Sequence, residues 1–98
     1  AAGILAAKRT WELLPLCHPI PVERLDLTYE FTATTVTVLV EVATHARTGI
    51  EMEALTAASI ASLCLYDMLK PHAGTNLKIR DVLLLKKTGG KSGDFLRA

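Results

Sequence analysis

The chain has 98 residues, half of them hydrophobic and few of them aromatic, with a net charge of +1. This length predicts a single domain spanning 1–98, with a core of aliphatic side chains and alanine. The near-neutral charge argues against a general nucleic-acid binder, and no apolar run approaches the length of a membrane span. Cys17 and Cys64 fit no metal or redox spacing, which favours reduced thiols in a cytosolic protein.

The first 16 residues predict a helix, because apolar side chains recur at helical spacing and form one face, namely Ile4, Leu5, Ala7, Trp11 and Leu14. Pro15 ends this helix. Pro19 and Pro21 then impose an extended conformation on the segment around His18.

Two strands follow. Residues 24–31 alternate cleanly, with Leu25, Leu27, Tyr29 and Phe31 on one face. Valine recurs at every second position from Val36 to Val42, so the two runs predict a hairpin. The link Thr32-Ala33-Thr34-Thr35 has little turn chemistry, which leaves open that a few loop residues are missing there.

A second helix is predicted after residue 47. Thr48 and Glu51 have capping-box spacing at its start, Lys70 lies in its last turn, and Pro71 marks its end. The residues between are apolar or small nearly all round, so we expect this helix to be buried on more than one side. Its alanines and serines would permit close approach of another element.

Residues 77–88 read as a last strand, so the order is helix, strand, strand, helix, strand. One further strand would complete the split βαβ pattern of ferredoxin-like folds. We therefore expect an α+β fold with two packed helices and a mostly antiparallel sheet, and we expect residues ahead of Ala1 to supply the additional strand.

The glycine-rich run KKTGGKSGDF suggests a phosphate site near Lys91. It is not a P-loop, because Leu85 stands where the leading glycine belongs and too few residues follow for the required helix. Two interpretations remain open. Glycine N–H groups and Lys91 can form an anion-binding concavity, or the segment is a solvated tail.

Four charged residues interrupt the second helix, namely Glu51, Glu53, Asp67 and Lys70. They are either a solvated edge with local ion pairs or functional groups. Glu53 and Asp67 lie about 21 Å apart on a straight helix, so they cannot share one small reaction centre within a chain. Either they contact different parts of an extended ligand, or a second subunit brings the two helix ends together. Burial on two sides favours a site across a subunit interface.

His18 is flanked by Cys17 and Pro19. Neighbouring side chains point apart in an extended segment, so a Cys–His nucleophile pair is not expected. His18 is either a hydrogen-bonded structural residue or a phosphate donor or acid/base group. His45 and His72 have no metal-ligand spacing, and no metal site is predicted.

Three segments together resemble the MoaC family of molybdenum cofactor biosynthesis: AAGILAAKRTWELLPLCHPIP, TGIEMEALTAASIASLCLYDMLK and KTGGKSGDF. The resemblance covers nearly the whole chain in the same order. It implies a ferredoxin-like subunit in a cytoplasmic homo-hexamer, a trimer of dimers with active sites at the dimer interface. It also implies a lyase with cyclic pyranopterin monophosphate synthase activity, which rebuilds a 3',8-cyclised dihydro-GTP intermediate and releases pyrophosphate without a metal or redox cofactor.

The resemblance also implies roles for particular residues. Asp67 and Lys70 correspond to the catalytic acid/base pair of the family. The residues that would contact the substrate or its phosphates are His18, Glu51, Met52, Glu53 and Lys91. No nucleic acid or membrane partner is expected.

A further catalytic lysine of the family lies in a KGDV-like motif upstream of the first helix, and the chain begins after that point. A second functional hypothesis is therefore a non-catalytic relative that binds a pterin or nucleotide. An RNA-binding module has little support, because the strands lack paired surface aromatics that stack bases.

Overall fold

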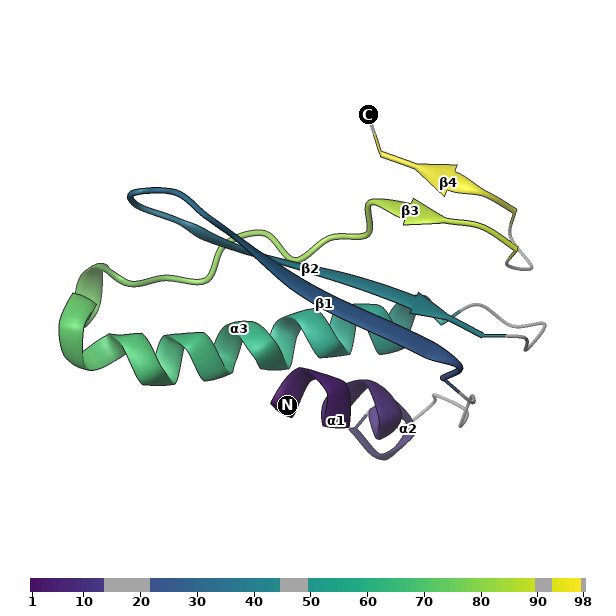
Figure 1. Cartoon of the computed structure of the whole chain (residues 1–98), viewed down its shortest axis with the longest axis horizontal. Helices are drawn as coiled ribbons and strands as arrows, with labels where there is room; N and C mark the ends of the chain where they lie inside the picture. The colour runs from purple at the N-terminus through teal and green to yellow at the C-terminus, as the bar shows by residue number, and fades with distance from the viewer. Residues whose placement is uncertain (14–21, 45–49, 90–92, 98) are drawn as a thin grey trace.

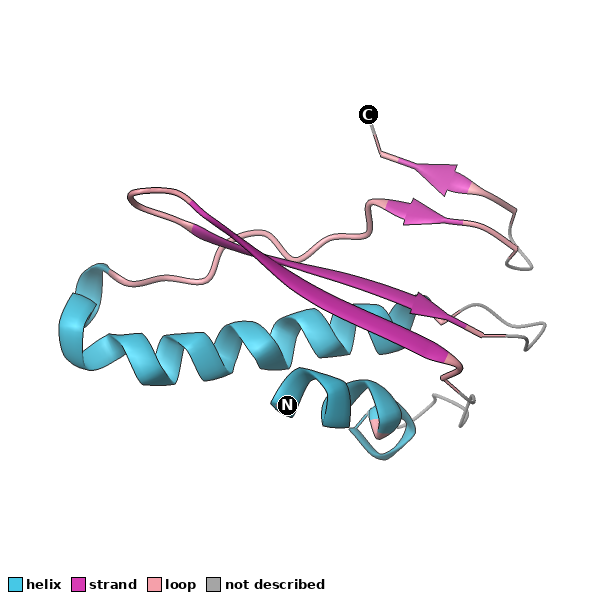
Figure 2. Cartoon of the chain, in the orientation of Figure 1, coloured by secondary structure: helices cyan, strands magenta, loops and turns pink. Residues whose placement is uncertain are grey.

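The computed structural model describes residues 1–13, 22–44, 50–89 and 93–97. Its elements are α1 (Ala2–Lys8), α2 (Thr10–Leu13), β1 (Arg24–Phe31), β2 (Val36–Ala43), α3 (Glu51–Ala73), the 3-10 turn η1 (Gly74–Asn76), β3 (Lys86–Lys87) and β4 (Phe95–Leu96). The long α3 lies against α1 and the β1–β2 hairpin, and β3 and β4 form a small hairpin near the C-terminus (Figure 1). Both strand pairs are antiparallel. The predicted α+β class, with packed helices and antiparallel strands, is confirmed (Figure 2).

Small residues hold α1 against the rest of the chain. Gly3, Ala6 and Ala7 are buried, whereas Ile4 and Leu5 are 41% and 52% exposed. The predicted inward face was therefore wrong for these two large side chains. Small residues let the α1 backbone approach α3 closely, which turns Ile4 and Leu5 outward.

Gly3 marks the closest point of this contact. A Cβ atom at Gly3 would lie 2.9 Å from Cδ1 of Leu27, 3.0 Å from the carbonyl oxygen of Ala57 and 3.2 Å from Cβ of Ala61. The first distance is shorter than ordinary carbon–carbon contacts allow. A side chain at Gly3 would therefore require Leu27 and the backbone of α3 to shift where α1, β1 and α3 meet.

The predicted first helix is broken in two at Arg9. The buried hydroxyl of Thr10 donates to the carbonyl oxygens of Ala6 and Ala7, at 3.1 and 3.0 Å. Threonine hydroxyls that bond back to the preceding turn bend helices. This local hydrogen bonding accompanies the change of direction from α1 to α2.

The hairpin register pairs apolar residues with apolar residues, for example Leu27 with Val40 and Tyr29 with Val38. The predicted alternation therefore sets the pairing of β1 with β2. The turn is closed by the hydroxyl of Thr32, which accepts the backbone N–H groups of Thr34 and Thr35 at 3.3 and 3.0 Å. The four-residue link is sufficient, and no missing loop residues are needed to explain it.

Helix α3 differs from its prediction at both ends. It begins at Glu51 after an N-cap at Ile50 that makes no side-chain hydrogen bond, and the predicted cap Thr48 lies outside the described residues. It continues through Pro71 and ends at Gly74, whose φ is 62°. Pro71 is tolerated because it lies in the last turn, where a proline removes only one helical hydrogen bond. Gly74 then takes the left-handed conformation that commonly ends helices.

The predicted strand over 77–88 is a strand only at Lys86–Lys87, where it pairs with β4. Residues 77–85 belong to no strand of the described structure. Several of their apolar side chains are exposed, including Ile79, Val82, Leu83 and Leu85. The pattern of a strand is present in the sequence, but a pairing partner for it is absent from the described residues.

Helix α3 is buried along one narrow stripe only, at Glu53, Ala57 and Ala61. Leu63 and Met68 are 54% and 65% exposed. Helix α3 packs against both α1 and β2, but none of its residues after Ala61 is buried, so the predicted burial on more than one side is incomplete in the described part of this chain. The apolar surface that α3 leaves uncovered is the kind that marks a contact with further protein.

The expectation that no run approaches the length of a membrane span was wrong. The helical segment Glu51–Asn76 has 26 residues and is long and apolar enough to cross a membrane by length and composition. A core or interface helix of a soluble domain passes the same test. The segment packs against α1 and β2, so length and composition alone do not place it in a membrane.

The close contact at Gly3 gives the first testable prediction. Gly3→Val should lower the free energy of unfolding by about 1–3 kcal/mol, because the added side chain overpacks the contact with Leu27 and Ala57. This loss exceeds any gain in helix propensity relative to glycine, which is below about 1 kcal/mol. Urea denaturation followed by circular dichroism would measure it.

The matched control is Leu5→Val, which changes an exposed side chain of the same helix and should alter stability by less than about 0.5 kcal/mol. Equal stability of Gly3→Val and the parent chain would show that α1 does not pack closely on α3.

Candidate active site

The candidate site residues on α3 form two groups at opposite ends of the helix. Glu51, Met52 and Glu53 lie in its first turn, and Asp67 and Lys70 lie near its C-terminal end. Because α3 is continuous between them, Glu53 and Asp67 are about 21 Å apart along the axis. One chain therefore does not bring the two groups together.

At the start of α3, Glu51 forms an ion pair with Lys87 of β3, with 3.5 Å between Oε2 and Nζ. The Lys87 side chain is only 13% exposed and that of Glu51 is 37% exposed. Glu53 is buried, at 2% exposure. Carboxylates are favoured at a helix N-terminus, where the helix dipole stabilises negative charge. Two acidic side chains and one shielded ammonium group thus gather at this end.

Lys87 is a candidate functional residue that the sequence did not reveal. It stands next to Lys86, and nothing in the local sequence distinguishes the two. Lys86 is exposed, whereas Lys87 is partly buried beside Glu51. The difference in burial between Lys86 and Lys87 arises because Lys87 contacts Glu51, which lies more than 30 residues away in the sequence. The local sequence pattern does not encode such a contact.

At the other end of α3, Asp67 and Lys70 form an ion pair with 2.9 Å between Oδ1 and Nζ. The hydrogen bond from Lys70 and its charge lower the pKa of Asp67. The same hydrogen bond and the charge of Asp67 raise the pKa of Lys70. Both side chains are more than half exposed, so Asp67 is ionised and Lys70 is protonated at neutral pH.

The glycine-rich run lies at the turn between β3 and β4, not between a strand and a helix, which agrees with the rejection of a P-loop. Gly89 and Gly93 have φ of 73° and 88°, as expected for glycines that take conformations closed to other residues. The N–H of Gly89 donates to Oδ1 of Asp94 at 3.1 Å. A phosphate that used this N–H group would have to displace the Asp94 carboxylate.

Two predicted contacts, His18 and Lys91, lie outside the described residues. Met52 is 41% exposed at the start of α3, and its predicted contact with substrate stays a prediction. Among the described residues, no group of three or more His, Cys, Asp or Glu side chains is placed to hold a metal ion.

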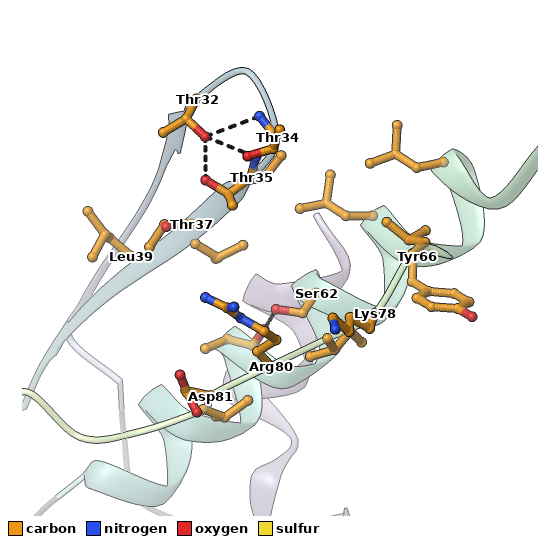
Figure 3. Close-up of a pocket in the computed structure, with 18 of the residues that line it drawn as sticks. Thr32, Thr34, Thr35, Thr37, Leu39, Ser62, Tyr66, Lys78, Arg80 and Asp81 are labelled. Carbon is orange, nitrogen blue, oxygen red and sulfur yellow. Dashed lines mark hydrogen bonds between the residues drawn. The ribbon is translucent and has the colours of Figure 1, made fainter. Parts of the chain in front are cut away.

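A cavity of about 800 Å³ lies elsewhere, between β2, residues 76–85 and α3 (Figure 3). Its polar lining includes Thr37, Ser62, Lys78, Arg80 and Asp81. None of the five predicted site residues on α3 lines it. The cavity and the two charged ends of α3 are therefore separate features.

The model of the MoaC family matches residues 1–90. Proteins named cyclic pyranopterin monophosphate synthase are similar to the chain. That of Brevibacillus brevis is 48% identical over 97 residues, which are 98% of this chain and 60% of the relative. That of Heliobacterium modesticaldum is 49% identical, over 98% of this chain and 61% of the relative. That of Listeria welshimeri is 50% identical, over 96% of this chain and 59% of the relative.

The chain thus spans about three fifths of the length of the curated relatives it matches. The family match begins at residue 1 and ends at residue 90, in the glycine-rich run. It therefore includes both charged ends of α3. By the extent of this match and the level of identity, the chain belongs to the MoaC family.

Proposed function

We propose that the polypeptide containing this chain is a cyclic pyranopterin monophosphate synthase of molybdenum cofactor biosynthesis. It would act as a lyase in the cytoplasm, converting the 3',8-cyclised dihydro-GTP intermediate to cyclic pyranopterin monophosphate and releasing pyrophosphate. The names of the relatives support the activity. The structural observation that carries the proposal is the pair of charged groups at the two ends of α3, Glu51–Lys87 and Asp67–Lys70.

The proposed active site needs two subunits. If the α3 helices of two copies packed antiparallel, the Asp67–Lys70 end of one would approach the Glu51–Lys87 end of the other. The exposed Leu63 and Met68 of α3 offer apolar surface for such a contact. An isologous dimer would then hold two equivalent sites, and three dimers would form the proposed hexamer.

Each group has a chemical role in this proposal. Lys70 carries a proton at neutral pH, so it would act as a general acid or neutralise negative charge that develops during ring rearrangement. The hydrogen bond with Asp67 positions the ammonium group of Lys70 and raises its pKa. Glu53, Glu51 and Lys87 would line the opposite wall. Lys91 and the glycine N–H groups beside it would bind the phosphates, and His18 would add a further donor.

Removing the acid/base pair tests the activity. Lys70→Ala and Asp67→Ala should each lower turnover by about 10²–10⁴-fold or more, the usual contribution of acid/base groups, while assembly is retained. Pyrophosphate release from the cyclised GTP intermediate by the full-length polypeptide would measure it. Lys86→Ala, which removes an exposed lysine of β3, is the matched control. Parent-like rates in both variants would refute the roles given to Asp67 and Lys70.

Subunit mixing tests whether the site spans an interface. Lys87→Ala and Lys70→Ala should both be inactive alone, and Lys86→Ala should be active. Random mixing of the two inactive variants should restore about a quarter of the parent activity, because half of the dimers are mixed and each mixed dimer has one intact site. Absence of recovery after exchange of subunits, or a monomer in sedimentation, would contradict the two-subunit site.

The ion pair can be tested by titration. Lys70→Ala should raise the pKa of the Asp67 carboxyl toward its ordinary value, because the hydrogen bond and the positive charge that lower it are removed. Since the pKa of Asp67 is lowered by folding, the pair stabilises the native state above the ordinary pKa of aspartate and loses this effect as pH falls through the lowered one. Carbon-13 NMR of the labelled carboxyl would follow this change, and an unchanged pKa would rule out the pairing.

A further inference from the structure

The pairing of β3 with β4 determines which of two adjacent lysines faces α3. Lys86 is exposed, whereas the Lys87 side chain is only 13% exposed, with its ammonium group 3.5 Å from Oε2 of Glu51. Successive side chains of a strand point to opposite faces, so a shift of β3 by one residue would turn Lys86 toward α3 and Lys87 toward solvent. The register of β3 therefore selects the lysine that lies at the start of α3.

The strand pairing by itself specifies this register weakly. In the described residues, β3 pairs with β4 at two positions, Lys86 with Leu96 and Lys87 with Phe95. Leu96 is 75% exposed, so its side chain contributes little burial that would favour one register over the other. Because the two paired residues of β3 are both lysines, a slip would also cost nothing in side-chain type. Further contacts are needed to fix the register.

One such contact lies at the turn end of the hairpin. Asp94 directly precedes β4, and its Oδ1 accepts the N–H of Gly89 at 3.1 Å. Gly89 lies two residues after Lys87 and has a φ of 73°, which a glycine adopts without strain. The hydrogen bond therefore ties the end of the β3 segment to the start of β4.

Arg97 makes the second contact, at the opposite end of the hairpin. Its backbone N–H donates to the carbonyl oxygen of Leu85 at 2.7 Å, and its Nε donates to the carbonyl oxygen of Leu84 at 2.8 Å. The guanidinium group also lies over the ring of Phe95, 5.2 Å from its centroid, a cation–π contact that holds the side chain across the hairpin. A slip of one residue would misplace both donors.

We propose that Asp94 and Arg97 are positioning residues that hold β3 in its observed register. That register presents Lys87, and not Lys86, to the carboxylate of Glu51. Together the two side-chain hydrogen bonds favour this register by about tenfold or more. The role of Lys87 in catalysis rests on the proposed function, whereas the choice between the two lysines does not.

Competitive acetylation of lysine amines, read by fragmentation mass spectrometry of the full-length polypeptide, would test this choice. In the parent, Lys86 should be acetylated at least about tenfold faster than Lys87, because the register holds Lys87 against α3. In the Asp94→Ala/Arg97→Ala variant, the two rates should agree within about threefold, since the two side-chain hydrogen bonds are lost. Circular dichroism should match the parent, because both replaced residues are exposed.

Two control variants separate the hydrogen bonds from a general loosening of β4. Asp94→Asn keeps a side-chain oxygen that can accept the N–H of Gly89, so it should label like the parent, whereas Asp94→Ala should bring the two rates closer. Leu96→Ala shortens an exposed side chain of the same strand and should also label like the parent. The proposal is overturned if Lys87 stays at least tenfold slower than Lys86 in the double variant, or if Leu96→Ala equalises the two rates as well.

Pyrophosphate release from the cyclised GTP intermediate distinguishes this proposal from the proposed function. If both hold, the double variant should lower kcat by about tenfold or more, and Asp94→Asn should retain the parent rate. Equal acetylation of the two lysines together with parent-like pyrophosphate release would support the positioning roles of Asp94 and Arg97 and would refute the role of Lys87 in catalysis.

Discussion

The arrangement of the described chain depends on the close packing of α1 on α3 at Gly3. Its missing side chain leaves room for Leu27 of β1 and for the backbone of α3 at Ala57, so this one position sets the spacing of three elements. Close approach requires small residues on the facing stripe, and the buried hydrophobic residues among those described are all alanines. The larger apolar side chains are consequently left on the outside, where they can serve contacts with further protein.

A second constraint follows from the length of α3. The helix is continuous from Glu51 to Ala73, and a helix of this length behaves as a rod that keeps its two ends apart. Folding of one chain therefore fixes each charged pair locally, Glu51 with Lys87 and Asp67 with Lys70. In the proposed dimer, assembly would decide whether the two pairs face one another. In the proposed enzyme, the chemistry depends on the same exposed surface of α3 that makes a single chain incompletely buried.

Sequence patterns predicted those features that depend on local alternation or composition. The register of β1 with β2 follows from the alternation of apolar residues, and α3 follows from its long apolar run. The orientation of α1 was missed because large apolar residues were expected inside, whereas Gly3 and the alanines permit closer packing. Lys87 was missed because its burial beside Glu51 is a contact between distant segments. The strand over 77–88 was over-predicted because a strand forms only where a partner edge is present.

In the proposed dimer, assembly would change the chemistry of the exposed Asp67–Lys70 pair. In the single chain, each partner favours the charged form of the other, so the pKa of Asp67 is lowered and that of Lys70 is raised. Burial against a second subunit would act in the opposite direction, because desolvation disfavours both charged forms. The attraction between the two groups also strengthens as water is excluded. The 2.9 Å contact would thus allow Lys70 to enter the proposed buried site with its proton. Without Asp67, Lys70 would enter the same site with a lower pKa and a weaker hold on that proton.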